Sequence, residues 1–317
     1  MPELMNRPRL CIRKIVVLLV TAIVSTSCLS VAQEVSARQQ RRRPFAALQT
    51  SDQLRHRTWE VDKVQREALV YIPEHATEKP VPVVFVFHGH GGNMRNSTRQ
   101  FPYYSEWPDA ISIYPQGLKT PGQLTDPEGK KSGWQKTSGD QNDRDLHFFD
   151  TMLKSLREEY KVDNDRIYST GHSNGGGFTY LLWSERGDEF AAMAPSGAAA
   201  NRLKKELKPK PVFHVAGDND PLVKFEWQRL MIARVVRLNG CGNGQKSGEH
   251  MTIYPSESGT PVVTWISHQG HKFPQESVRD AVAFLKQQSR DGKSASSGSK
   301  SSGAPESQET EASGMDR

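Results

Sequence analysis

The sequence has little cysteine, with three residues of this type in a chain of 317. Cys11 and Cys28 lie in an N-terminal segment that is typical of a cleaved leader, so the mature chain is expected to keep only Cys241. One cysteine cannot form an internal disulfide, which excludes a fold held together by cross-links. Within "LNGCGNG", Cys241 is expected to be a small, inert residue at a helix end, and a catalytic thiol is the alternative.

The excess of positive over negative charge is also small. The formal net charge is +6, and residues 1–32 contribute +3 of it through four basic residues and one acidic residue. The remaining charge is too small for a chain of this length to indicate a nucleic-acid partner. The sequence also lacks a tight metal-ligand cluster such as His-x-x-x-His, so we expect neither a metal nor any other cofactor.

The N-terminal apolar run, Ile15–Val24, is shorter than a membrane-spanning helix requires. Basic residues precede it and small residues follow at Ser30 and Ala32, which predicts a signal peptide over residues 1–32 and a secreted, periplasmic or cell-envelope protein. Two alternatives stay open, an uncleaved anchor from Ile15 to Ala32 and a lipid on Cys28. Only these alternatives would hold the chain at a membrane.

Both flanks of the central region lack the apolar residues that a core needs. Residues 33–54 are rich in Gln and Arg and are expected to form a linker. Residues 289–317 contain Met315 as their one large apolar residue, so burial cannot offset the entropy of ordering them. We therefore expect a disordered low-complexity tail over 289–317 and a folded domain over 55–288, without internal repeats.

Strand-like and helix-like segments alternate within this domain. The run "VPVVFVFHG" (81–89) is continuously apolar, as a strand covered on both faces is, whereas "REALVYIP" (66–73) alternates and ends at proline, which favours an edge strand. Buried strands alternating with helices predict an α/β fold, with a mainly parallel central sheet flanked by helices on both faces. The remaining segments are strands at 109–117, 162–170, 190–198, 211–221 and 261–271, and helices at 146–160, 176–187, 226–240 and 275–288.

A Gly-x-Ser-x-Gly pattern surrounds Ser173 in the stretch "STGHSNGGG". The pattern uses common residues and is weak alone, the alternative being an ordinary glycine turn. Its position is informative, because Ser173 follows a predicted strand and precedes a predicted helix, at the sheet edge where functional groups gather. The glycines permit a tight corner, and the helix N-terminus favours an anion beside the serine.

A serine hydroxyl becomes a nucleophile when a base takes its proton and an acid orients that base. Candidate partners lie downstream, since Asp218 and Asp220 follow one predicted strand and His268 and His271 follow the next. The order Ser, Asp, His, each after a separate strand, is the order found in α/β hydrolases. The sequence therefore predicts a catalytic triad built on Ser173.

The segment "VFVFHGHGGN" (84–93) places a glycine-rich loop directly after a buried strand. We expect the main-chain NH of His90 or Gly91, together with that of Asn174, to form an oxyanion hole. Each such donor typically contributes about 10²- to 10³-fold in rate. The alternative for this loop is a plain turn.

Three further residues lie beside the predicted site. Trp134 is a candidate wall of the substrate pocket, with a tryptophan packed on the surface as the alternative. His172 is a second candidate for substrate binding. For His172 and His88 alike, a supporting, hydrogen-bonded role is favoured over catalysis.

These motifs together resemble the secreted α/β-hydrolase esterases related to polyhydroxybutyrate depolymerases and to feruloyl and acetylxylan esterases. The resemblance covers about residues 58–287 and implies the α/β-hydrolase fold, with Ser173 as nucleophile, Asp220 as acid and His271 as base. Pro221 constrains the loop after Asp220, whereas Asp218 is expected to cap the turn and His268 to flank the site. The motifs that carry the resemblance are "LVYIP", "VFVFHGHGG", "YPQG", "GW", "DRDLHFF", "DNDRIYSTGHSNGGG", "AGDNDPLV" and "GHKFP".

The sequence thus predicts a serine esterase that works through an acyl-enzyme, without a cofactor, on small or oligomeric esters such as feruloyl or acetyl sugar esters or hydroxyalkanoate oligomers. Hydrolysis of insoluble polymer is not expected, because no polymer-binding module is recognised and Phe273 stands where many relatives have Trp. Two alternatives stay open. One is a peptidase of the prolyl oligopeptidase group, and the other is a non-catalytic envelope binding protein on the same fold.

Overall fold

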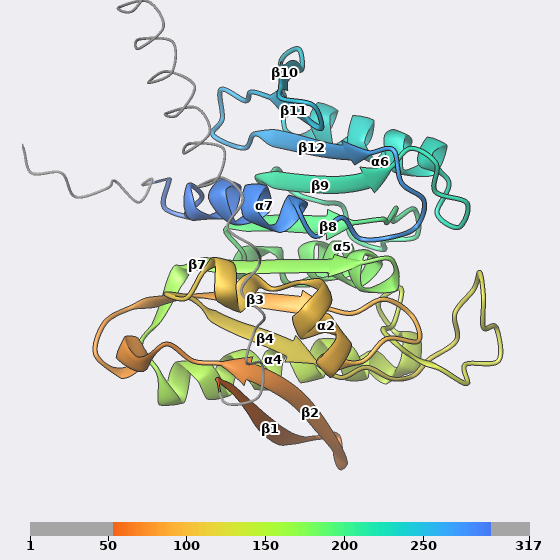
Figure 1. Cartoon of the computed structure of the whole chain (residues 1–317). Helices are drawn as coiled ribbons and strands as arrows, with labels where there is room; N and C mark the ends of the chain where they lie inside the picture. The colour runs from red at the N-terminus through yellow and green to blue at the C-terminus, as the bar shows by residue number, and fades with distance from the viewer. Residues whose placement is uncertain (1–52, 293–317) are drawn as a thin grey trace, which may run out of the picture. The chain divides into compact units, whose positions relative to one another are not determined.

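A ten-stranded sheet runs through the computed structural model, which describes residues 53–292 (Figure 1). The predicted signal peptide, the predicted linker up to residue 52 and residues 293–317 lie outside the described residues. In sheet order, the strands are β1 (Leu54–Val61), β2 (Val64–Tyr71), β4 (Ile111–Pro115), β3 (Val81–Phe87), β7 (Val162–His172), β8 (Ala192–Ser196), β9 (Val212–Gly217), β12 (Val262–Ser267), β11 (Met251–Tyr254) and β10 (Gln245–Ser247).

The six central strands, from β4 to β12, pair in parallel, and their arrows point the same way in Figure 1. Antiparallel strands extend the sheet on both sides, through β2 and β1 next to β4 and through β11 and β10 next to β12. This arrangement confirms the predicted mainly parallel sheet. It also brings the carboxyl ends of the parallel strands to one edge of the sheet.

The prediction that residues 66–73 form an edge strand is wrong. The corresponding strand β2 pairs with β4 on one side and with β1 on the other, in a register that runs from Leu54 opposite Tyr71 to Val61 opposite Val64. A two-residue turn closes this hairpin, and both of its residues, Asp62 and Lys63, take positive φ angles of 51° and 65°. Such angles are those of the hairpin turn that matches the twist of paired strands.

Helices cover both faces of the sheet, as predicted (Figure 1). Apolar side chains of α4, α5 and α6 pack against one face, and those of α2, α3 and α7 pack against the other. Short 3₁₀ turns and a small two-stranded sheet complete the fold. The helices are α2 (Met94–Gln100), α3 (Tyr103–Glu106), α4 (Arg144–Glu159), α5 (Asn174–Arg186), α6 (Phe225–Leu238) and α7 (Ser277–Lys286). The 3₁₀ turns are η1 (Glu74–Thr77), η2 (Asp140–Asp143) and η3 (Gly187–Glu189), and the small sheet pairs β5 (Leu118–Lys119) with β6 (Ser132–Gly133).

Strand β3 shows how the sequence forms the two cores. All seven of its residues are buried, and alternate side chains enter opposite layers: Phe85 and Phe87 join the cluster under α4 and α5, whereas Val84 and Val86 join the cluster under α2, α3 and α7. Burying one such side chain contributes about 1.5–3 kcal/mol. The continuous apolar run therefore specifies a strand at the centre of the sheet.

The described residues reach slightly past the predicted domain. Strand β1 begins at Leu54, the last residue of the predicted linker. After α7, the main-chain NH of Arg290 donates to the carbonyl of Asp165 at 3.0 Å, and its guanidinium bonds to the same residue's carboxylate. The first residues of the predicted tail, up to 292, thus pack on the domain.

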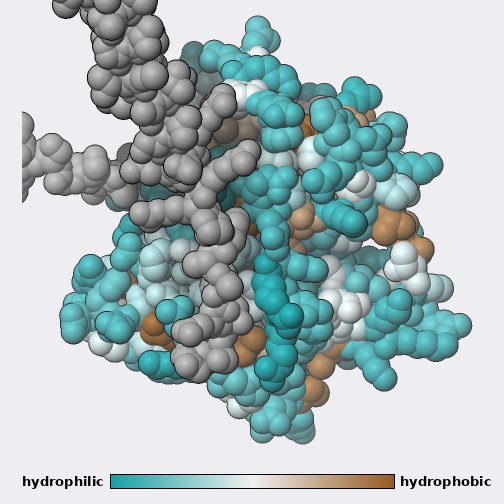
Figure 2. Space-filling view, viewed as in Figure 1, coloured by the Kyte–Doolittle hydropathy of each residue, from teal (hydrophilic) through white to brown (hydrophobic). Residues whose placement is uncertain are grey.

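The surface of residues 53–292 is largely polar. On the face drawn in Figure 2, hydrophobic residues form small separate patches among hydrophilic ones. Within this part of the chain, no helix combines the length and the apolar character needed to cross a membrane.

A buried ion pair joins β2 to α4. The Nη2 atom of Arg66, on β2, lies 2.9 Å from Oδ1 of Asp145, and both side chains are almost fully buried. The other carboxylate oxygen accepts the main-chain NH of Gln135 at 2.9 Å. The pair therefore fixes the segment that carries Trp134, one residue before Gln135.

We predict that Arg66→Met and Asp145→Asn each lower the free energy of unfolding by about 3–5 kcal/mol, because either change leaves a buried polar partner uncompensated. Urea denaturation measures the loss. As a control, Glu158→Gln removes an exposed pair with Lys154 and is expected to cost about 1 kcal/mol or less. Equal losses for the buried and exposed pairs would contradict this interpretation.

Candidate active site

Ser173 lies at the corner between β7 and α5, with φ 57° and ψ −119°. A positive φ is costly for a residue with a side chain and is kept where the surroundings enforce it. The surroundings here are glycines in close contact. A Cβ added to Gly175 would lie 2.2 Å from the carbonyl oxygen of Phe87, and one added to Gly171 would lie 2.6 Å from the main chain of Gly175. The glycines of the Gly-x-Ser-x-Gly pattern are thus required by packing.

The structure brings the three predicted triad residues together. The Oγ atom of Ser173 lies 2.7 Å from Nε2 of His271, and Nδ1 of His271 lies 2.7 Å from Oδ2 of Asp220. The acid follows β9 and the base follows β12, which are adjacent parallel strands. This geometry lets His271 accept the serine proton while Asp220 holds the imidazole in the tautomer that has Nε2 free.

The carboxylate of Asp220 is surrounded by donors. Its Oδ1 accepts the main-chain NH groups of Leu222 at 2.9 Å and Val223 at 3.0 Å. Its Oδ2 accepts from His271 and, at 3.2 Å, from Nε2 of Gln228. Donors on both oxygens fix the orientation of the carboxylate.

The rival residues Asp218 and His268 pair with each other instead. Nδ1 of His268 lies 2.6 Å from Oδ2 of Asp218, and the His268 side chain is 78% exposed, against 16% for His271. Between the two acids, the side chain of Asn219 donates to the carbonyl of His268 at 3.1 Å. This outer pair therefore ties the acid loop to the base loop without reaching Ser173.

The expected oxyanion donors have different environments. The main-chain NH of Gly91 donates to the carbonyl of Ser132 at 2.7 Å, so the expectation that Gly91 contributes to the hole is wrong. Within the described residues, the NH groups of His90 and Asn174 have no such partner. The loop passes directly beside the nucleophile, since a Cβ on Gly89 would lie 3.5 Å from Cβ of Ser173.

The side chain of Asn174 clamps the segment that follows β6. Its Oδ1 accepts the main-chain NH of Trp134 at 2.7 Å, and its Nδ2 donates to the carbonyl of the same residue at 2.9 Å. Trp134 itself has no exposed surface, packs against Phe87 and Phe178, which also contact each other, and donates its indole NH to the carbonyl of His88 at 2.8 Å. The proposal that Trp134 lines the substrate pocket is therefore wrong, because the ring lies beneath the site.

Both ring nitrogens of His172 are used inside the protein. Nε2 donates to the carbonyl of His271 at 3.3 Å, so Nδ1 accepts from the hydroxyl of Ser196 at 3.0 Å. Burial lowers the pKa of His172 to about 4, which keeps the ring neutral. His172 thus supports the base loop, and its predicted role in substrate binding stays a prediction.

His88 has a similar supporting role beneath the oxyanion loop. Its Nε2 accepts the main-chain NH of Gly117 at 2.9 Å, and its Nδ1 donates to the carbonyl of Gly89 at 2.8 Å. Burial lowers the pKa of His88 to about 4. The ring therefore stays neutral and holds the loop that leads to His90.

The side chain of His90 is anchored to the loop between β5 and β6. Its Nε2 lies 3.0 Å from Oδ2 of Asp126, which also accepts the main-chain NH of Lys131 at 2.8 Å. The Lys131 NH and the imidazole lower the pKa of Asp126 to about 2, against burial, which raises it. An ionised carboxylate thus holds the residue whose NH borders Ser173.

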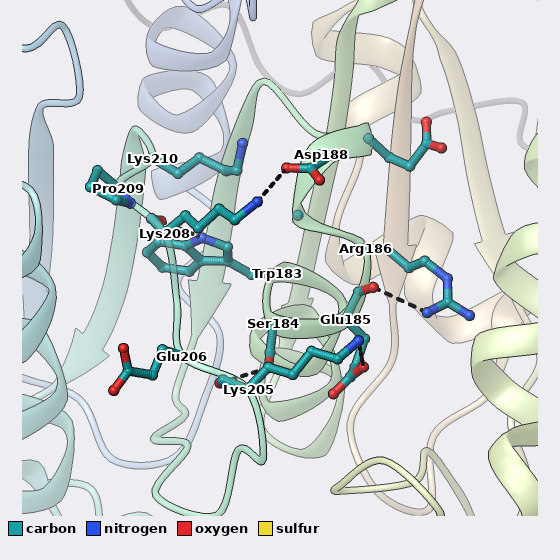
Figure 3. A pocket seen from close by; sticks show the side chains of 12 residues that line it. Trp183, Ser184, Glu185, Arg186, Asp188, Lys205, Glu206, Lys208, Pro209 and Lys210 are labelled. Atoms are coloured by element: carbon teal, nitrogen blue, oxygen red, sulfur yellow. Dashed lines mark hydrogen bonds and ion pairs between the residues drawn. The ribbon is translucent and has the colours of Figure 1, made fainter.

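A separate pocket of about 510 Å³ lies at the far end of α5 (Figure 3). This helix begins next to Ser173 and has 13 residues, which places its other end about 20 Å away at 1.5 Å per residue. The charged side chains of the pocket neutralise one another, as in the pairs Lys208–Asp188 at 3.3 Å and Lys205–Glu185 at 2.7 Å. The pocket offers no group placed to act on an ester at Ser173.

Residues 53–292 contain neither a metal site nor an activated thiol beside the triad. No group of three His, Cys, Asp or Glu side chains in this range is arranged to hold a metal ion. The thiol of Cys241 lies 3.7 Å from the carbonyl of Thr260, and burial raises its pKa. A raised thiol pKa disfavours the reactive thiolate.

Sequence reasoning missed Gln228, which contacts the acid of the site. The signal was present, because Gln228 lies on the same helical face as Met231, Ile232 and Val235, all of which are buried. A polar residue on the apolar face of a helix needs an internal hydrogen-bond partner. Asp126 gave no comparable signal, since its role depends on a loop conformation.

Comparison with known proteins identifies the relatives of this chain. A probable feruloyl esterase C from Aspergillus flavus is 26% identical over 65% of this chain and 75% of that protein. A feruloyl esterase D from Neurospora crassa is 26% identical over 69% of this chain and 78% of that protein. No protein-family model matches the chain.

The structure of an acetyl xylan esterase from Aspergillus awamori is similar, with a TM-score of 0.56 and 14% identity, covering 73% of this chain and 99% of that one. At this identity the likeness shows the fold alone, which is the predicted α/β-hydrolase fold. The predicted resemblance to feruloyl and acetylxylan esterases is confirmed. So is the predicted class of enzyme, a hydrolase that acts on ester bonds, because the sequence relatives are feruloyl esterases.

We predict that acid destabilises the fold through His88 and His172. Their folded-state pKa values of about 4 lie below the usual 6.5, so the unfolded chain binds more protons between these values. The free energy of unfolding should therefore be fully retained above pH 6.5 and fall as the pH drops toward 4. Urea denaturation from pH 8 to 4 measures this slope, which should be shallower in His88→Asn. A free energy of unfolding that does not change between pH 8 and pH 4 would contradict the assignment of His88 and His172 as neutral rings in the folded protein.

Proposed function

We propose that this chain is a serine esterase in which Ser173, His271 and Asp220 form the catalytic triad. The observation that carries the proposal is the continuous chain of two 2.7 Å contacts from Ser173 Oγ through the imidazole to Asp220. The strained corner at Ser173 supports it further, because a positive φ of 57° presents the side chain at the tip of the strand-to-helix turn.

In the proposed acylation step, Oγ of Ser173 attacks the carbonyl carbon of the ester while Nε2 of His271 takes its proton. The negative charge of the tetrahedral intermediate would be bound by the free main-chain NH groups of His90 and Asn174. His271 then returns the proton to the alkoxide oxygen as the carbon–oxygen bond breaks. The alcohol leaves, and the acyl group stays on Ser173.

In the deacylation step, water replaces the alcohol. His271 accepts one proton of the water as its oxygen attacks the acyl carbon, and the second tetrahedral intermediate is bound by the same NH groups. Collapse of this intermediate returns the proton to Oγ of Ser173 and releases the carboxylic acid. Asp220 stays ionised throughout and stabilises the imidazolium form of His271.

For substrates we propose feruloyl or acetyl esters of sugars. This proposal rests on the relatives, which are named feruloyl esterases, and on the fold shared with an acetyl xylan esterase. Hydroxyalkanoate oligomers are the second candidate substrates. The same relatives favour ester substrates over the peptides that a peptidase of the prolyl oligopeptidase group would cleave. Export of the enzyme is a further proposal, based on the signal segment predicted for residues 1–32.

Turnover of p-nitrophenyl acetate and butyrate tests the triad. We predict that Ser173→Ala and His271→Ala lower kcat by about 10⁴- to 10⁶-fold and that Asp220→Ala lowers it by about 10⁴-fold, because the three side chains act as one unit. The matched controls are Asp218→Ala and His268→Ala, which remove the outer pair and should retain kcat within about threefold. Near-wild-type turnover by Ser173→Ala would refute the proposal, and a control as damaging as its rival would overturn the assignment.

A substrate panel tests the proposed specificity. Methyl ferulate, acetylated xylo-oligosaccharides, hydroxybutyrate oligomers and a proline-containing peptide amide are compared by kcat/KM. We expect the feruloyl or acetyl sugar esters to exceed the peptide by at least about 100-fold, a difference that corresponds to about 2.7 kcal/mol in the transition state. A higher kcat/KM for the peptide would favour the peptidase alternative.

A further inference from the structure

Three polar side chains lie in the core behind the proposed acid. Tyr180 on α5 and Gln228 on α6 have no exposed surface, and His214 on β9 is 1% exposed. Buried polar groups are costly unless they bond to one another, so each needs a partner inside the protein. The three residues come from different elements, yet they form a connected set that ends at Asp220.

The first link joins Tyr180 to His214, with a distance of 2.8 Å between the hydroxyl and Nδ1. Burial raises the pKa of Tyr180, so its hydroxyl stays protonated and donates a hydrogen bond to Nδ1. Burial also lowers the pKa of His214 to about 4, so the ring is neutral and has one NH. Because Nδ1 accepts, that NH is at Nε2.

The second link joins His214 to Gln228. Nε2 of His214 and Oε1 of Gln228 are both buried, and neither meets strict hydrogen-bond geometry with any atom of the described residues. Nε2 is a donor and Oε1 an acceptor, so the two buried, unpaired atoms complement each other, and the side chain of Gln228 raises the pKa of His214 against the effect of burial.

The third link joins Gln228 to the acid. Its Nε2 donates to Oδ2 of Asp220 at 3.2 Å and to the carbonyl of Val223 at 2.7 Å. Both contacts are with acceptors, which identifies this end of the side chain as the amide nitrogen. Gln228 thus ties the acid loop to α6 and shares Oδ2 with His271.

We propose that Tyr180, His214 and Gln228 form a buried hydrogen-bond relay that positions the carboxylate of Asp220, with Gln228 as its contact residue. Every donor in the relay is directed toward Asp220, from the Tyr180 hydroxyl through the His214 NH to the Gln228 amide. Such alignment polarises successive bonds along the relay. This inference rests on the proposed triad, in which Asp220 orients His271. Gln228 is a positioning residue, because it acts through Asp220 and does not touch the substrate.

Two substitutions at Gln228 separate positioning from space filling. Gln228→Met keeps the volume and removes the donor, so kcat should fall about tenfold with KM unchanged, equally at every pH. Gln228→Glu places a carboxyl beside Asp220. When ionised it repels the acid, and when protonated it donates as the amide does, with a pKa raised by the neighbouring charge. Its activity relative to wild type should therefore rise at least severalfold between pH 9 and pH 6.

The titratable side chains that interact with Gln228 are His214 and Asp220, with His271 behind the latter. Each variant is compared with wild type at the same pH. A Gln228→Met enzyme with wild-type kcat, or a Gln228→Glu activity ratio that is independent of pH, would overturn the relay.

Tyr180→Phe provides a second, milder test that removes only one hydroxyl. We expect kcat to fall about two- to threefold, with no further loss when Tyr180→Phe is added to Gln228→Met, because the relay is then already interrupted. Tyr114→Phe is the matched control, since its buried hydroxyl donates to the carbonyl of Phe101 at 2.9 Å, outside the relay. It should lower the melting temperature and leave kcat unchanged.

Multiplicative effects of Tyr180→Phe and Gln228→Met on kcat, or an equal loss of kcat in Tyr114→Phe, would contradict the relay. The failure of the proposed triad is distinguished by Ser173→Ala. If that variant keeps its activity, the triad is wrong. If it is inactive and the Gln228 and Tyr180 variants behave like wild type, only the relay is wrong.

Discussion

The close approach of α5 to the end of β3 is the constraint on which the rest of the site depends. A Cβ at Gly175 would lie 2.2 Å from the carbonyl oxygen of Phe87, a separation that no side chain can occupy. Because β3 leads into the loop with His90, and α5 begins at Asn174, this contact sets the distance between the two free NH groups and the nucleophile. The positive φ of Ser173 follows from the same packing.

Burial separates the two acid–histidine pairs at this edge of the sheet. The Asp218–His268 contact is as short as the Asp220–His271 contact, but its histidine is 78% exposed, so solvent screens the interaction. Asp220 has donors on both oxygens, one of them from the buried side chain of Gln228, whereas the outer pair joins two loops at the surface. The Asp220–His271 pair is suited to orient a base, and the Asp218–His268 pair to hold together the two loops that carry the acid and the base.

The parallel sheet and the position of Ser173 could be predicted from the sequence, because buried strands are continuous apolar runs and the glycine-rich corner follows one of them. Strand β1 escaped prediction, since "LRHRTWEV" is largely polar and gains its place only by pairing with β2. The glycine-rich loop after β3 lies beside Ser173, as the sequence predicted, but the hydrogen bond of Gly91 to Ser132 depends on a tertiary contact that the sequence does not show. Trp134 was misplaced because the rings of Phe87 and Phe178, distant in sequence, enclose it.

The most direct test of the central claim is covalent labelling of the nucleophile. The full-length protein is treated with a fluorophosphonate, and the site of the adduct is identified by mass spectrometry of its peptides. A serine activated by His271 and Asp220 reacts once per chain, so a single adduct on Ser173 is predicted, with none in His271→Ala. An adduct on another residue, or an unlabelled Ser173 in folded wild-type protein, would contradict the proposed triad.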